Sequence, residues 1–143
     1  AVYVFASAGA TWVEQAYVKE ARASSGDAFG TAVSLSSDGN TLAVGAPNES
    51  GGGTGITTLQ NTRIGGSGVA YVFGRTYPEW WQLDYVKASN TGAGDRFGWG
   101  VVLSADARAL AVSAPAEASA AIGIDGNQSD NSTPTAGAAY VVQ

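Results

Sequence analysis

The densest group of oxygen-bearing side chains lies near the C-terminal end of the sequence. Asp125, Asn127 and Ser129 alternate along the chain, and Asp130 follows directly. Side-chain oxygens at alternating positions are typical calcium ligands in loops, so these four residues form a candidate calcium site. The expected glycine and final glutamate of such a loop are absent, however. A loop whose side chains bond their own backbone is therefore the alternative.

Aromatic side chains offer a second kind of chemistry, the stacking of sugar rings. Tyr77 and Trp81 flank a proline and are expected to be exposed, which makes them candidate ligand-binding residues. Trp12 and Trp80 recur at a fixed spacing and are expected to pack on an outer strand. Trp99 is expected in the core. Packing and sugar recognition therefore both stay open for this group.

Composition argues against several classes of function. The sequence has no histidine and no cysteine, so it cannot form a Ser-His-Asp triad, a Cys-His pair or a common zinc site. No cofactor is indicated apart from the calcium considered above. Its 12 acidic and 7 basic residues give a net charge of −5, which disfavours nucleic acid as a partner. No segment has the apolar length of a membrane span. We expect a non-enzymatic protein.

The elements that position these residues follow from an internal repeat of 68 residues. Residues 26–30 return as 94–98, and residues 42–47 return as 110–115, each with one change. Of the 49 pairs between residues 1–49 and 69–117, 21 are identical. A fixed period over this length indicates one supersecondary unit stacked on copies of itself.

The residue pattern within each repeat predicts short β-strands joined by tight turns. Helical periodicity is absent, and strands such as 42–46 are apolar on both faces, which requires burial on both sides. Four antiparallel strands per repeat predict an all-β fold of β-propeller blades. A stacked solenoid and a two-sheet sandwich are the alternatives. The expected strands are 2–5, 12–19, 29–35, 41–45, 69–73, 80–87, 97–103, 110–114 and 138–142.

Two short motifs in each repeat resemble those of a known protein family. Phe29-Gly30 with Gly45-Ala46-Pro47, and Phe97-Gly98 with Ala114-Pro115, resemble the FG-GAP repeat. This repeat builds the propeller at the head of integrin α chains, and the surrounding residues look most like the version in bacterial exported proteins. The resemblance implies an extracellular or cell-surface location, with roles such as adhesion.

The sequence departs from the integrin pattern in three places. Ser113 stands where the second repeat should have the glycine of its Gly-Ala-Pro triplet. Ala107-Arg108 replaces Gly39-Asn40, so we expect a different turn in the second hairpin. The segment 36–40 is too short for the family's calcium loop, and that metal site is not carried over.

Several charged residues recur in both repeats. Asp27 and Asp95 precede the Phe-Gly pairs, and Lys19 and Lys87 end the Tyr-Val-Lys triplets. A catalytic acid would occur once, whereas recurrence favours a structural role. We expect the aspartates to bind backbone N–H groups of their loops.

The repeats divide the chain into outer strands of a partial blade (1–25), a complete blade (26–93) and a blade without its last strand (94–143). Two repeats are too few to close a propeller. We therefore expect a segment of a larger exported protein that binds a protein or glycan through its long loops, 48–68 and 116–137. The alternatives are a ring or filament built from further copies by strand exchange, and an accessory domain of a larger secreted enzyme.

Overall fold

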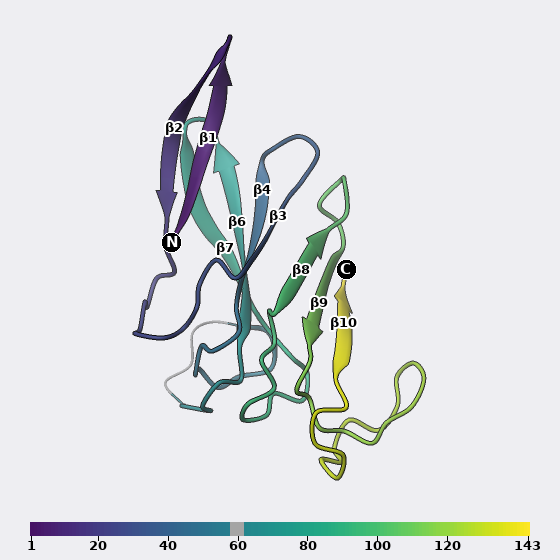
Figure 1. Cartoon of the computed structure of the whole chain (residues 1–143). Coiled ribbons are helices and arrows are strands. Elements are labelled where there is room, and N and C mark those ends of the chain that lie inside the picture. Colours follow the sequence, from purple (N-terminus) through teal and green to yellow (C-terminus); the bar gives the residue numbers. More distant parts are fainter. Residues whose placement is uncertain (58–61) are drawn as a thin grey trace.

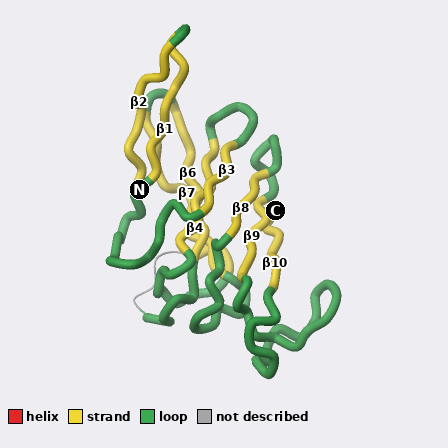
Figure 2. Tube along the Cα trace, in the orientation of Figure 1, coloured by secondary structure: helices red, strands yellow, loops and turns green. Residues whose placement is uncertain are grey.

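The computed structural model describes residues 1–57 and 62–143, and this part of the chain is all-β. Figure 2 shows strands joined by loops and turns, with no helix. Pairs of strands are joined alternately by tight hairpins and by long loops. The strands are β1 (Val2–Ala8), β2 (Thr11–Val18), β3 (Ala32–Leu35), β4 (Thr41–Ala46), β5 (Gly55–Thr57), β6 (Val69–Thr76), β7 (Glu79–Lys87), β8 (Gly100–Leu103), β9 (Leu110–Ala114) and β10 (Ala138–Val142).

Three antiparallel sheets follow one another along the chain (Figure 1). The N-terminal pair is β1–β2, the central blade is β3–β4–β6–β7 with β5 added at the outer edge, and the C-terminal blade is β8–β9–β10. In repeat order these sheets hold strands three and four, then one to four, then one to three. The sheets are blades of the propeller type, and the described residues do not close a ring.

The repeat is kept in the strand register as well as in the sequence. Leu42 on β4 faces Phe73 on β6, and Leu110 on β9 faces Val142 on β10. The two pairs occupy equivalent positions in their blades once the one extra residue of the C-terminal loop is counted. The register therefore confirms the structural repeat that the sequence predicted.

Two apolar cores lie between neighbouring sheets. One joins the N-terminal pair to the central blade, and its centre is Tyr71, which packs edge-to-face on Phe29 and on Tyr85 with ring centroids 5.5 Å apart in both cases. The other joins the central and C-terminal blades and contains Phe97 against Tyr140 at 5.4 Å. The small residues of β4 and β6 allow the sheets to approach closely.

Two packing predictions are wrong, each for its own physical reason. Trp12 is 72% exposed, because the sheet face that carries it has no neighbouring sheet in this structure. Trp99 is 49% exposed because Gly98, at a φ of 88°, breaks the alternation, so β8 begins only at Gly100. Trp80 does pack against the first core, as predicted.

The loop 48–68 is not wholly irregular, which corrects the sequence interpretation. Within it β5 pairs with the outer edge of β7, placing Ile56 opposite Val86. The strand is only three residues long, Gly55-Ile56-Thr57, a pattern too short to show periodicity.

The second β-hairpin uses the same turn as the first, and the expected difference is wrong. Ala107 adopts a φ of 59° where Gly39 has 68°. Asp106 Oδ1 accepts bonds from Ser104 Oγ at 2.7 Å and from the Arg108 N–H at 3.2 Å, as Asp38 does in the first hairpin. These hydrogen bonds stabilise the turn although alanine disfavours the positive φ that the turn requires.

Ala107→Gly is therefore expected to stabilise the protein by about 1 kcal/mol, because glycine adopts positive φ without steric cost. Chemical denaturation of both proteins measures the difference. The reverse change at the first turn, Gly39→Ala, is the matched control and should destabilise by a similar amount. An Ala107→Gly variant of unchanged stability would contradict the explanation.

Among the residues that the structure describes, no helix has the length and hydropathy needed to cross a membrane.

Candidate functional site

The long loops gather at one end of the blades, opposite the β1–β2, β3–β4 and β8–β9 turns (Figure 1). The loop 116–137 carries Ile122 and Ile124, which are 91% and 93% exposed. Gly123 between them has a φ of 78° and presents both side chains to solvent. Two neighbouring isoleucines without cover form an apolar tip on a rigid scaffold, which is typical of a contact surface. The sequence analysis named the loop but missed these residues.

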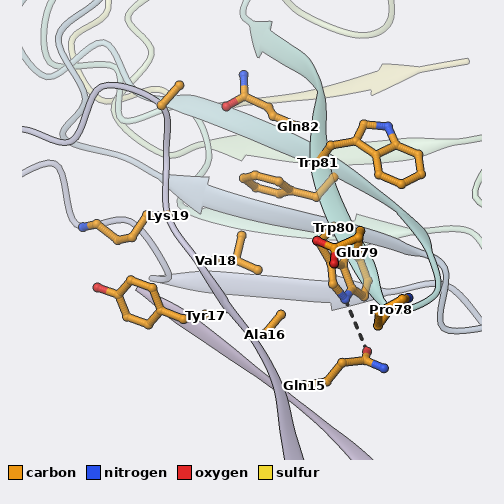
Figure 3. A pocket seen from close by; sticks show the side chains of 12 residues that line it. Gln15, Ala16, Tyr17, Val18, Lys19, Pro78, Glu79, Trp80, Trp81 and Gln82 are labelled. Carbon is orange, nitrogen blue, oxygen red and sulfur yellow. Dashed lines mark hydrogen bonds between the residues drawn. The ribbon is translucent and has the colours of Figure 1, made fainter.

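A groove of about 460 Å³ lies between β2 and β7 (Figure 3). Gln15 accepts a hydrogen bond from Trp80 Nε1 at 3.4 Å and one from Arg75 Nη1 at 2.9 Å. Lys19 and Trp81 also line the groove. Arg75 stacks over the Trp80 ring at 5.5 Å, so Trp80 is held in place by its neighbours. The groove presents polar and aromatic groups together, as a sugar site requires.

The two aromatic residues predicted to bind a ligand are both exposed but differ in position. Trp81 lines the groove and is 43% exposed. Tyr77 lies in the β6–β7 turn, is 76% exposed and does not line the groove. Figure 3 shows Trp81 pointing away from Trp80. The structure therefore does not assemble Tyr77, Trp80 and Trp81 into one stacking platform, and sugar binding by Tyr77 and Trp81 stays a prediction.

The candidate calcium residues form local turns. Asn127 Oδ1 accepts from the Ser129 N–H at 3.0 Å, and Asp130 Oδ1 accepts from the Ser132 N–H at 2.9 Å. Within residues 1–57 and 62–143, no three acidic side chains converge in a way that fits a metal ion. This geometry fits the alternative of a self-bonded loop. Calcium binding stays a prediction, and a melting curve unchanged by a chelator would remove it.

A buried polar cluster, the latch, joins the loop 48–68 to the outer strand of the central blade. Glu49 Oε2 accepts from Tyr85 Oη at 2.8 Å and from Lys87 Nζ at 3.2 Å, while Glu49 Oε1 accepts from the Gly51 N–H at 2.7 Å. Lys87 also donates to Ser67 Oγ at 2.7 Å. Burial lowers the pKa of Lys87, and the Glu49 carboxylate opposes that shift. In the sequence, Lys87 is the repeat of Lys19 and Glu117 is the repeat of Glu49, but the pairing of Glu49 with Lys87 cannot be read from it.

The C-terminal blade has only the acidic half of the latch. Glu117, at the position of Glu49, is 1% exposed and accepts from Asn90 Nδ2 at 2.7 Å and from the Ser119 N–H at 3.1 Å. Ser119 Oγ donates to Glu117 Oε2 at 2.9 Å. The serine hydroxyl thus bonds the oxygen that Tyr85 and Lys87 bond in the central blade.

The repeated aspartates have the structural role that their recurrence predicted. Asp27 Oδ2 accepts from the Ser24 N–H and Asp95 Oδ2 from the Gly92 N–H, both at 2.7 Å. Burial raises the pKa of Asp95, and the Gly92 bond opposes the rise. Both side chains therefore close the loop before a Phe-Gly pair.

The Phe-Gly motif of one blade contacts the Gly-Ala-Pro motif of the blade before it. A Cβ placed on Gly45 would lie 1.9 Å from the Gly98 carbonyl oxygen, and one on Gly98 would lie 2.1 Å from the Val69 carbonyl oxygen. Only glycine permits this backbone approach. The two motifs thus form one backbone contact between neighbouring blades.

Glu20 stands where the next repeat has the buried Ala88. Its Oε2 is buried without a hydrogen-bond partner among the described residues, and Lys19 Nζ lies 3.9 Å from its Oε1. Burial, with the nearby Asp27 carboxylate, raises the pKa of Glu20 to about 7. A carboxyl group with a raised pKa favours folding while it is protonated and disfavours folding once it ionises.

Glu20→Gln is expected to raise the free energy of unfolding by about 2 kcal/mol at pH 8. At pH 4 both proteins should be equally stable, because Glu20 is then protonated in both the folded and the unfolded state. The wild-type protein therefore loses stability as the pH rises from about 4.5, the ordinary pKa of glutamate, to about 7, the pKa of folded Glu20, and its stability changes little above that. Denaturation curves across this pH range test the prediction, and the exposed Glu79→Gln should match wild type throughout.

One comparison with known proteins found a match. Residues 12–73, from β2 to β6, match the FG-GAP repeat family. The chain contains an FG-GAP repeat. The matched range begins on the fourth strand of one blade and ends on the third strand of the next, so it includes the first Phe-Gly and Gly-Ala-Pro words of the FG-GAP pattern. Searches of curated proteins and of solved structures found no match.

Proposed function

We propose that the chain is a non-catalytic extracellular FG-GAP module that binds a protein or glycan through its loop end. The observation that carries this proposal is the apolar tip of the loop 116–137, where Ile122 and Ile124 are 91% and 93% exposed. Covering apolar area releases about 25 cal/mol per Å², so a partner with an apolar pocket would gain affinity there. The FG-GAP family supports the extracellular location, and the absence of histidine and cysteine supports a non-catalytic role.

The test is a binding screen of the whole chain against a glycan array and a panel of extracellular matrix proteins. For any protein ligand found, Ile122→Ser/Ile124→Ser is expected to weaken binding at least roughly tenfold, because central apolar side chains dominate interface energy. Val13→Ser is the matched control, since Val13 is also exposed but lies on the distal part of the N-terminal pair. Equal binding by all three proteins would overturn the loop assignment.

A glycan ligand would favour the groove instead of the loop tip. In that case Trp81→Ala should weaken binding, because Trp81 lines the groove and is partly exposed. Tyr77 lies outside the groove, so Tyr77→Ala is the control: if it weakens glycan binding as much as Trp81→Ala does, the effect is not specific to the groove. Loss of glycan binding on Ile122→Ser/Ile124→Ser alone would place the glycan on the loop tip.

A structural subunit that assembles into a ring or filament is the second candidate function. The observation that favours it is the edge of β10, which within residues 1–57 and 62–143 pairs only with β9, although its counterpart β6 has a strand on both sides. Unpaired edges recruit further strands. Sedimentation of the chain over a range of concentrations tests this, and a folded monomer at all of them would exclude assembly. A role beside an enzyme in a longer secreted protein is a third candidate.

A further inference from the structure

The two interfaces between neighbouring sheets are built from equivalent residues, with one exception. Each interface contains a valine, a phenylalanine and a tyrosine at equivalent repeat positions. In the N-terminal interface, between β1–β2 and the central blade, they are Val18, Phe29 and Tyr71. In the C-terminal interface, between the central and C-terminal blades, they are Val86, Phe97 and Tyr140. The exception lies two residues after the valine, where the N-terminal interface has Glu20 and the C-terminal interface has Ala88.

The exchange of alanine for glutamate leaves polar atoms unsatisfied in the N-terminal interface. Glu20 is 6% exposed, and its Oε2 and the Tyr71 Oη are both buried without a hydrogen-bond partner among the described residues. In the C-terminal interface, Ala88 presents a methyl group, and Tyr140 Oη donates a hydrogen bond to Asn90 Oδ1. The packing of an interface of this kind therefore does not need a carboxyl group, and burying one costs free energy.

The groups around Glu20 favour its neutral form. They come from its own segment, from the segment before β3, from the loop after β4, from β6 and from the chain start, and they are Lys19, Asp27, Glu49, Tyr71 and the α-amino group of Ala1. Burial and the carboxylates of Asp27 and Glu49 raise the pKa of Glu20 to about 7, while Lys19 and the α-amino group lower it. The Lys19 side chain is 39% exposed, so water screens its charge. Ionisation of Glu20 therefore places a poorly compensated charge in the interface.

The N-terminal interface can open without breaking a sheet. Within residues 1–57 and 62–143, β1 and β2 pair only with each other, so side-chain packing and a few hydrogen bonds join them to the central blade. Local openings of this kind cost less free energy than global unfolding. Lys19 and Ala21, on either side of Glu20, line the groove between β2 and β7 (Figure 3). An opening at Glu20 therefore moves one wall of the groove.

We propose that Glu20 is a proton-controlled switch that closes the N-terminal interface when protonated and opens it when ionised. The ionised carboxylate repels Asp27 and Glu49 and requires water, so the N-terminal pair separates from the central blade and the groove widens. The sequence has no histidine, the residue that ordinarily supplies a switch at neutral pH. The switch acts whether or not the groove or the loop end binds a ligand.

The sign of the pH dependence follows from the two states of the interface. In the open interface Glu20 is in water and has the ordinary pKa of about 4.5, whereas in the closed interface its pKa is about 7. The open population therefore rises as the pH rises from about 4.5 to about 7, and it changes little above that.

The chain has no cysteine, so a single introduced cysteine reports the opening at its own position. Val18→Cys places it in the N-terminal interface and Val86→Cys at the equivalent position of the C-terminal interface, where the two valines are 5% and 2% exposed. We measure the rate of labelling by N-ethylmaleimide in each variant. The ratio of the Val18→Cys rate to the Val86→Cys rate should rise at least roughly tenfold from pH 5 to pH 8. Taking the ratio cancels the intrinsic pH dependence of thiol reactivity.

Further variants assign the rise to Glu20. Adding Glu20→Gln, or Glu20→Ala to match Ala88, should make the ratio independent of pH. Adding Glu14→Gln, an exposed position on β2, should leave the rise intact. A ratio that does not change with pH in the parent chain would overturn the switch, and so would an equal rise in Glu20→Gln. The measurement uses no ligand, so its outcome is separate from that of the binding screen.

Discussion

Replacing Lys87 by methionine is expected to lower the free energy of unfolding by about 4 kcal/mol. The Lys87 side chain is fully buried and supplies the only cation that pairs with Glu49 among the described residues, at 3.2 Å. Methionine keeps most of the volume, so the loss comes from a buried carboxylate left without its counter-charge. Urea denaturation at neutral pH measures the change.

The matched control and the double variant separate charge from packing. Lys19→Met, at the same repeat position, should cost less than about 1 kcal/mol, because its side chain is 39% exposed and its ion pair is long. Glu49→Leu/Lys87→Met should recover a large part of the stability lost in the single variant, since it removes both charges. If the double variant is less stable than Lys87→Met, the latch stabilises through its hydrogen bonds and not through charge balance.

Gly45→Ala is expected to destabilise the protein by about 3 kcal/mol and to lower its Tm by roughly 10 °C. The new Cβ would lie 1.9 Å from the Gly98 carbonyl oxygen, so the central and C-terminal blades must move apart. Gly65→Ala is the control, because a Cβ there meets nothing within 4 Å and the backbone is not in the left-handed region. Calorimetry compares the three proteins, and equal melting of Gly45→Ala and wild type would contradict the close contact between blades.

Strand order and the repeat were predictable because they depend on local pattern. The predicted strands lie within a few residues of the observed ones. The prediction rested on the Phe-Gly and Gly-Ala-Pro motifs, the hairpin at Asp38 and the strand 41–45, which is apolar on both faces. The shared register of Leu42 and Leu110 follows from the same repeat. These features need no knowledge of the neighbouring sheet.

Exposure and side-chain pairing were not predictable, because they depend on which sheet lies beside each blade. Val33 and Val101 have the same sequence context and opposite burial. Glu49 and Lys87 recur in both repeats, yet only their meeting across 38 residues in the fold defines the latch. Ile122 and Ile124 carry no repeat signal at all, so their exposure could be seen only in the structure.

The approach of Gly98 to Gly45 is also expected to restrict the order in which repeats of this kind can follow one another in a chain. If segments 26–93 and 94–143 exchanged places, the Ser113 side chain would face the glycine carbonyl oxygen of a Phe-Gly motif. At the equivalent contact in this structure, a Cβ on Gly45 would lie only 1.9 Å from the Gly98 carbonyl oxygen, so a serine does not fit there. The two segments are 68 residues apart and share most core positions, yet they are not interchangeable neighbours. We therefore expect Gly45, which contributes no side chain, to limit which of the two segments can precede the other along a chain.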